Sequence, residues 1–102
     1  MKYNLYVVRQ IRKIQNKIGK KETLEKLNIG RTVIWRWESN EYRPSLDHLS
    51  NICILSAQIF CKKNTNRSEE IKKMYKELFM QGLYCLMVDY YEKNNNILST
   101  SL

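Results

Sequence analysis

One stretch, residues 20–45 (KKETLEKLNIGRTVIWRWESNEYRPS), constrains the fold of this chain more than any other part of its sequence. The stretch predicts a helix over residues 20–28, a tight turn at Asn28-Ile29-Gly30, and a second helix over residues 31–39. Asparagine and glycine both tolerate the positive φ that a sharp reversal between helices demands. Pro44 then closes another turn, and the serine after it can cap the following helix.

The predicted helix over residues 31–39 has two unlike faces when its residues are placed 100° apart. Ile34 and Trp37 fall on the side that would be buried. Thr32, Trp35 and Arg36 point the other way. An exposed tryptophan beside an arginine is unusual on an ordinary solvent-facing helix. This face therefore either binds a partner or packs on another part of the chain.

The formal net charge of +8 is concentrated in the first half of the sequence. Residues 1–43 hold 11 Lys/Arg and 4 Asp/Glu, a net charge of +7, whereas residues 44–102 hold 7 and 6, a net charge of +1. A polyanion is the natural partner for the first half. The alternative is a general excess of lysine and asparagine in the proteome, and the near-neutral second half argues against it.

Two further helices are predicted around this stretch, over residues 3–17 and 46–61, with Gly19 ending the first. Together the four helices predict a compact, all-α domain over residues 1–61. The expected core positions recur at helical spacing in both flanking helices. They are Leu5, Val8, Ile11 or Arg12, Ile14 and Ile18 in one, and Leu46, Leu49, Ile52, Cys53, Ser56, Ile59 and Phe60 in the other.

A polar linker over residues 62–68 separates this domain from a long amphipathic C-terminal helix expected over residues 69–93 and capped by Ser68. That helix has more apolar surface than one small domain easily covers, so a second subunit is expected to bury the excess. The alternative is that it lies across the first and fourth helices of its own chain. The tail, residues 94–102, is rich in Asn and Ser and is predicted to be disordered. The residues expected at the dimer or partner contact are Met74, Leu78, Leu83, Leu86 and Tyr90.

Several classes of protein are not expected from this sequence. Cys53, Cys61 and Cys85 are irregularly spaced, and the lone His48 adds little ligation, so we expect reduced core cysteines and no metal or cofactor. The sequence contains no Ser/His/Asp or Cys/His set and no glycine-rich phosphate loop, so no enzyme is predicted. Residues 1–8 lack the apolar run of a signal peptide, and residues 78–88 are too short to span a bilayer.

Leu27, Ile29 and Ile34 are followed along the chain by Glu38, Asn40 and the Pro44-Ser45 pair. Through this pattern residues 5–60 resemble the helix-turn-helix domain of the Xre/Cro-repressor family. Leu24 stands where that family usually has alanine, and the larger leucine can splay the second and third helices. Asn28 replaces the usual turn glycine. The residues in register with the family pattern are Leu27, Ile29, Ile34, Glu38, Asn40, Pro44 and Ser45.

The resemblance implies roles for particular residues. Lys20 matches a DNA-contacting position at the start of the second helix. Arg12 and Glu38 match a buried, structural ion pair between the first and third helices. Four residues match recognition-helix positions: Arg31, Thr32, Trp35 and Arg36.

These observations lead to the hypothesis of a repressor-like, sequence-specific regulator that binds double-stranded DNA as a homodimer on an inverted-repeat operator. Arg36 or Arg31 would contact a guanine and Thr32 a thymine methyl. The expected phosphate contacts are Lys20, Lys21 and Arg43. The expected location is the cytoplasm, for a bacterial or phage-encoded protein that associates with the nucleoid when it is bound. The alternative is a protein-binding module, or a toxin-neutralising antitoxin, acting through the C-terminal helix.

Overall fold

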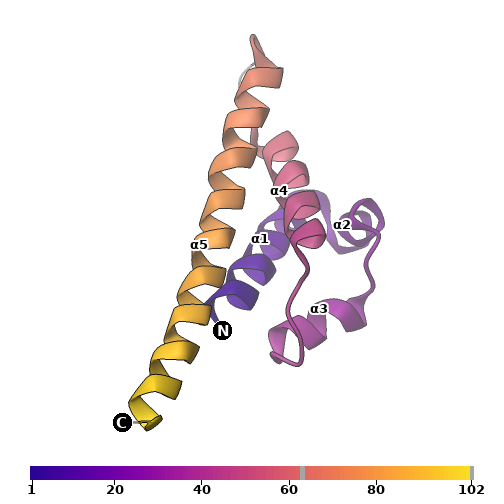
Figure 1. Ribbon diagram of the computed structural model, residues 1–102. Helices are drawn as coiled ribbons and strands as arrows, with labels where there is room; N and C mark the ends of the chain where they lie inside the picture. The colour runs from indigo at the N-terminus through magenta and orange to yellow at the C-terminus, as the bar shows by residue number, and fades with distance from the viewer. Residues whose placement is uncertain (63, 102) are drawn as a thin grey trace.

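The protein is all-α, as the sequence predicts. The computed structural model describes residues 1–62 and 64–101, with side chains as far as Asn95. Within these residues it contains no strand. The helices are α1 (Lys2–Ile18), α2 (Lys20–Leu27), α3 (Arg31–Glu38), α4 (Leu46–Phe60) and α5 (Arg67–Ser101) (Figure 1).

The short helices begin and end at the residues that the sequence indicates. Gly19 has a φ of 95° between α1 and α2, and Asn28 takes the left-handed conformation with a φ of 54° at the end of α2. Asn40 has a φ of 60° beyond α3, and the Ser45 hydroxyl accepts the His48 N–H at 3.2 Å to cap α4. Gly30 is extended, with a φ of −95°, so the reversal between α2 and α3 depends on Asn28.

The core is built around α1, whose buried arc contains polar as well as apolar side chains. The predicted core positions Leu5 and Leu46 are both wrong, since each is 50% exposed. Asn4, by contrast, is buried and donates from Nδ2 to the backbone oxygens of Trp37 and Tyr42, at 3.0 Å each. These hydrogen bonds satisfy both N–H donors of the buried amide. The buried hydrophobic residues of the core cluster are Tyr3, Val7, Val8, Ile11, Ile14, Leu27, Ile34, Trp37, Leu49, Ile52 and Cys53.

Tyr3 fastens the turn between α3 and α4 to α1. Its hydroxyl donates to the carbonyl oxygen of Pro44 at 3.0 Å, and the carbonyl oxygen of Ser45 lies 3.4 Å away. Burial raises the pKa of Tyr3 to about 12, so the hydroxyl remains a donor at neutral pH. Together with Asn4, this contact fixes both ends of the segment that leaves α3.

The long helix α5 lies across α1 and α4, on the side away from α2 and α3 (Figure 1). The intramolecular arrangement of this helix is therefore the one that the structure adopts. Tyr6 donates from its hydroxyl to the Leu78 carbonyl at 2.6 Å. Asp89 accepts the backbone N–H groups of Lys2 and Tyr3, each at 2.9 Å, and so caps α1.

The boundaries of α5 differ from the prediction at both ends. The helix begins at Arg67, so Ser68 lies inside it rather than capping it, and the linker is correspondingly shorter. At the other end residues 94–101 are helical where disorder is expected, and Leu102 lies outside the described residues. Neither glycine nor proline follows Gly82 to break the helix.

Gly82 allows α5 to approach the core closely. A Cβ atom at this position would lie 2.7 Å from Leu49 Cδ1 and 3.1 Å from Tyr6 Cε1. Leu49 is fully buried and has little room to move. We therefore expect Gly82→Val to lower the free energy of unfolding by about 1–3 kcal/mol through overpacking, measured by urea denaturation.

The matched control is Gln81→Val, which places the same side chain at the adjacent, exposed position of α5. It should change the free energy of unfolding by only about 0.5 kcal/mol, the difference in helix propensity. Equal effects of the two substitutions would contradict the close packing of α5 on Leu49.

Candidate nucleic-acid interface

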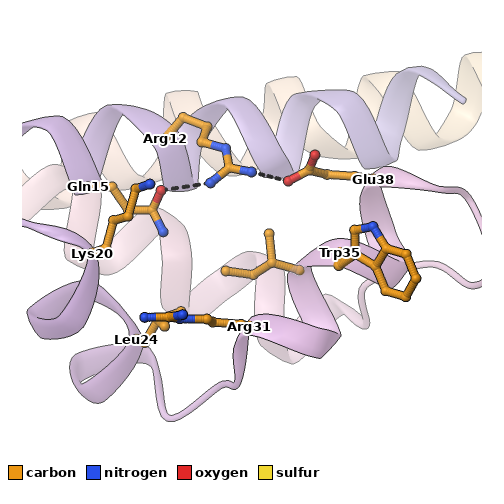
Figure 2. Close-up of a pocket in the computed structure, with 8 residues that line it drawn as sticks. Arg12, Gln15, Lys20, Leu24, Arg31, Trp35 and Glu38 are labelled. Atoms are coloured by element: carbon orange, nitrogen blue, oxygen red, sulfur yellow. Dashed lines mark hydrogen bonds and ion pairs between the residues drawn. The ribbon is translucent and has the colours of Figure 1, made fainter.

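The helix α3 is held on α1 by its buried face and by an ion pair. Ile34 and Trp37 are buried, and the Arg12 guanidinium donates both to the Glu38 carboxylate and to Gln15 Oε1 (Figure 2). The predicted pair between Arg12 and Glu38 is therefore present. The expectation that it is buried is wrong, because its side chains are 47% and 39% exposed. A pair this exposed contributes about 0–1 kcal/mol, so its main effect is to orient α3.

The opposite face of α3 points to solvent, as the helical wheel predicts. Trp35 is 65% exposed, and Thr32 and Arg36 are exposed beside it. Trp35 thus does not bury its ring on another part of the described chain. The structure therefore excludes one of the two alternatives, the packing of this ring on another described part of the chain.

Three of the predicted DNA-contacting residues surround one hollow between α1, α2 and α3. Lys20 lies at the start of α2, while Arg31 and Trp35 come from the first and second turns of α3 (Figure 2). Among the residues that the structure describes, no ion pair joins Lys20 or Arg31 to a carboxylate. Both cations are therefore available to an external anion. The other residues lining the hollow are Arg12, Gln15, Leu24, Ile34 and Glu38.

Leu24 lies between the two helices that border this hollow. Both α2 and α3 contact α1 more extensively than they contact each other. Leu24 is half-buried and packs against the core cluster. The expectation that a residue larger than alanine at this position splays α2 and α3 stays a prediction.

The remaining candidates lie outside the hollow. Lys21 is exposed on α2. Arg36 lies with its Nε atom 3.6 Å from the Glu41 carboxylate, a contact that sequence reasoning missed. Arg43 is exposed but lines a different hollow beside α5, with Leu86 and Met87 among its neighbours. The structure therefore brings Lys20, Arg31 and Trp35 together, but not Arg43.

The residues predicted for a dimer contact on α5 are largely used inside the chain. Leu78, Leu83 and Leu86 are partly buried against the core cluster, and Met74 is half-buried. Only Tyr90 of the five is exposed, at 61%. The face of α5 that does point outward carries other residues: Met80, Tyr84, Met87 and Tyr91.

The side chains that could support catalysis or metal binding take part in packing and helix capping instead. His48 Nδ1 lies 2.8 Å from the Ser45 hydroxyl, and its ring meets Trp37 edge to face at 5.0 Å. Burial raises the pKa of the Cys53 thiol to about 11, which keeps it unreactive. No group of three or more His, Cys, Asp or Glu side chains within the described ranges is placed to hold a metal ion. No helix of the described part is both long and apolar enough to cross a membrane.

The surface built by α2 and α3 can therefore bind an anion and an apolar or stacking group side by side. Lys20 and Arg31 supply the positive charge, and Trp35 supplies a flat ring beside them. Comparison with protein-family models, with curated proteins and with solved structures gives no match for this chain.

Proposed function

We propose that this chain is a sequence-specific, double-stranded DNA-binding transcription regulator of the repressor-like kind, without enzymatic activity. The observation that carries the proposal is the cluster of Lys20, Arg31 and the exposed Trp35 on the basic half of the chain. An α-helix with its side chains is about 10–12 Å across, and the major groove is about 12 Å wide. A helix of this size, held on a rigid support, suits insertion into that groove.

Each side chain has a role in this proposal that follows from its chemistry. Arg31 donates to the two acceptors of a guanine edge, and Thr32 contacts a thymine methyl. Trp35 packs on a sugar or on a thymine methyl. Lys20 and Lys21, at the start of α2, bind phosphates and set the register of α3 on the duplex. Arg43 contributes a phosphate contact farther from the groove, and Arg36 contributes less than Arg31 because Glu41 pairs with it.

Charge favours DNA over a protein as the partner of α3. The residues around Trp35 include the unpaired cations Lys20 and Arg31 rather than an apolar rim. A protein partner would have to bury these charges or supply carboxylates for them. A duplex supplies phosphates throughout its length.

A second candidate function belongs to α5, whose outward face remains exposed. That face could cover a protein target, as a toxin-neutralising antitoxin would, while α3 still binds DNA. The DNA-binding proposal includes a homodimer on an inverted repeat and a cytoplasmic location, for a bacterial or phage-encoded protein. The cluster of Lys20, Arg31 and Trp35 supports DNA binding and does not bear on the homodimer or the location.

Selection of bound duplexes from a random pool tests the proposed function. The chain should enrich one short half-site, and its affinity for that duplex should fall steeply with salt, by a slope of about −0.9 for each phosphate neutralised. Enrichment of no sequence, with binding that is equally weak to every duplex, would contradict sequence-specific regulation.

The pairing of Arg36 with Glu41 leads to a further prediction. Glu41→Gln removes the carboxylate 3.6 Å from Arg36 and a negative charge close to the DNA. We expect affinity for the selected duplex to rise about three- to tenfold, with a steeper salt dependence, measured by fluorescence anisotropy. The matched control is Glu69→Gln, whose carboxylate also lies 3.6 Å from a lysine but on α5, and it should leave affinity nearly unchanged.

A further inference from the structure

The helix α5 has a second apolar face, opposite the one that packs on α1 and α4. Met80, Tyr84, Met87 and Tyr91 are 56%, 68%, 68% and 69% exposed. They are spaced by four, three and four residues, the alternation that places side chains along one seam of a coiled coil. An exposed apolar seam of this regularity is typical of an interaction surface.

The chemistry of this seam indicates what kind of partner it fits. Asp89 is the only charged residue between Leu78 and Tyr91, and its carboxylate is turned inward onto the backbone N–H groups that begin α1. In a chain with a net charge of +8, residues 78–91 of α5 therefore carry no outward charge. Two copies can approach along the seam without burying a charged residue of α5, and the exposed Arg43 at the edge of the neighbouring hollow can keep its guanidinium in solvent.

We propose that this seam pairs with the same seam of a second copy of the chain, in antiparallel orientation. The two-fold axis would pass between Tyr84 and Met87, so that each methionine of one copy faces a tyrosine of the other. Met80 would lie against Tyr91, and Tyr84 against Met87. Sulfur–aromatic contacts favour this pairing over the parallel register, which would place methionine on methionine and tyrosine on tyrosine.

The surface beside the seam supports the same register. A largely apolar hollow opens next to Met87 and Tyr91, at the position that Met80 and Tyr84 of a second copy would reach. Because the axis is two-fold, the hollow of each copy would be filled in the same way. The residues lining it are Arg43, Leu86, Met87, Tyr90, Tyr91 and Asn94.

The area available is enough for a specific contact. With roughly 100 Å² buried by each of Met80, Tyr84, Met87, Tyr90 and Tyr91, the pair would bury about 1,000 Å² in total, the lower limit for a biological interface. The inference rests on the proposed function only in that a two-fold pair would present two copies of α3 to an inverted repeat. Pairing itself does not require DNA.

Sedimentation equilibrium tests the pairing directly. The unmodified chain should be a dimer at about 100 µM, and Tyr84→Glu should be a monomer with unchanged helical circular dichroism, because a carboxylate would be buried in the seam. Asn51→Glu adds the same charge on the exposed side of α4 and should remain a dimer. A monomeric unmodified chain, or a dimer that survives Tyr84→Glu, would overturn the proposal.

The orientation of the two helices has its own test. The double variant Tyr84→Glu/Met87→Lys places opposite charges against each other in the antiparallel register and like charges against each other in the parallel one. It should dimerise more strongly than Tyr84→Glu alone, at least tenfold. No recovery would overturn the antiparallel register. Binding of the Tyr84→Glu monomer to a single half-site reports on the proposed function separately, so a failure of one proposal can be told from a failure of the other.

Discussion

Replacing Trp37 by alanine is expected to lower the free energy of unfolding by about 3–5 kcal/mol. The ring is fully buried in the cluster that joins α1, α3 and α4, and its centroid lies 5.0 Å from that of the His48 ring in an edge-to-face arrangement. Alanine would remove this contact area and leave a cavity at the support of α3. Since small domains are stable by about 5–15 kcal/mol, this loss is a large fraction of the total, and the variant should unfold at a clearly lower urea concentration. Urea denaturation followed by circular dichroism measures the loss.

Trp35→Ala provides the matched control, because it removes the same side chain two residues earlier. Trp35 is 65% exposed, so its replacement should change the free energy of unfolding by no more than about 0.5 kcal/mol. The two tryptophans should therefore differ by several kcal/mol in stability. If both substitutions lowered the free energy of unfolding equally, Trp35 would be packed against the protein rather than exposed to solvent.

Arg31→Ala is expected to weaken binding to the selected duplex by about 10- to 100-fold and to relax the preference at one base pair. The reason is that Arg31 begins the outward face of α3 and no described carboxylate pairs with it. Lys20→Ala, in contrast, should weaken binding to all duplexes alike and reduce the salt slope by about one. Fluorescence anisotropy against the selected duplex and its single-base variants separates the two effects.

Lys72→Ala is the control for the loss of one positive charge, since Lys72 lies on α5 and its partner Glu69 does too. It should leave affinity and base preference close to those of the unmodified chain. If Arg31→Ala behaves like Lys72→Ala, then α3 does not enter the groove through its first turn.

Local patterns in the sequence predict the short helices and their faces well. Gly19, Asn28, Asn40 and Ser45 mark helix ends because each residue type satisfies a particular backbone requirement there. The helical period also separates the buried Trp37 from the exposed Trp35, because the angle between two residues of a helix is fixed.

The buried arc of α1 could not be predicted from hydrophobicity alone. Asn4 is buried because the carbonyl groups of Trp37 and Tyr42 lie within reach of its amide, and these belong to a distant segment. Leu5 is exposed because no neighbouring helix covers its side of α1. Tertiary packing, rather than local pattern, decides both positions.

The sequence does not determine which face of α5 packs on the core, because two of its faces are apolar. Gly82 and Asp89 distinguish the two faces. Gly82 lacks the side chain that would collide with Leu49, and Asp89 is a lone acid that caps α1. Both lie on the inward face, but their significance depends on partners more than 30 residues away. The contact of Arg36 with Glu41 and the displacement of Arg43 toward α5 likewise depend on the path of the turn after α3.

Binding of the double variant Arg31→Ala/Trp35→Ala to the selected duplex and to a scrambled one tests the central claim most directly. The claim is that the outward face of α3 reads DNA sequence. The unmodified chain should prefer the selected duplex by about 1,000-fold or more, and the double variant, with its stability unchanged, should bind both duplexes with similar, weak affinity. A folded double variant that keeps the original preference would contradict the account.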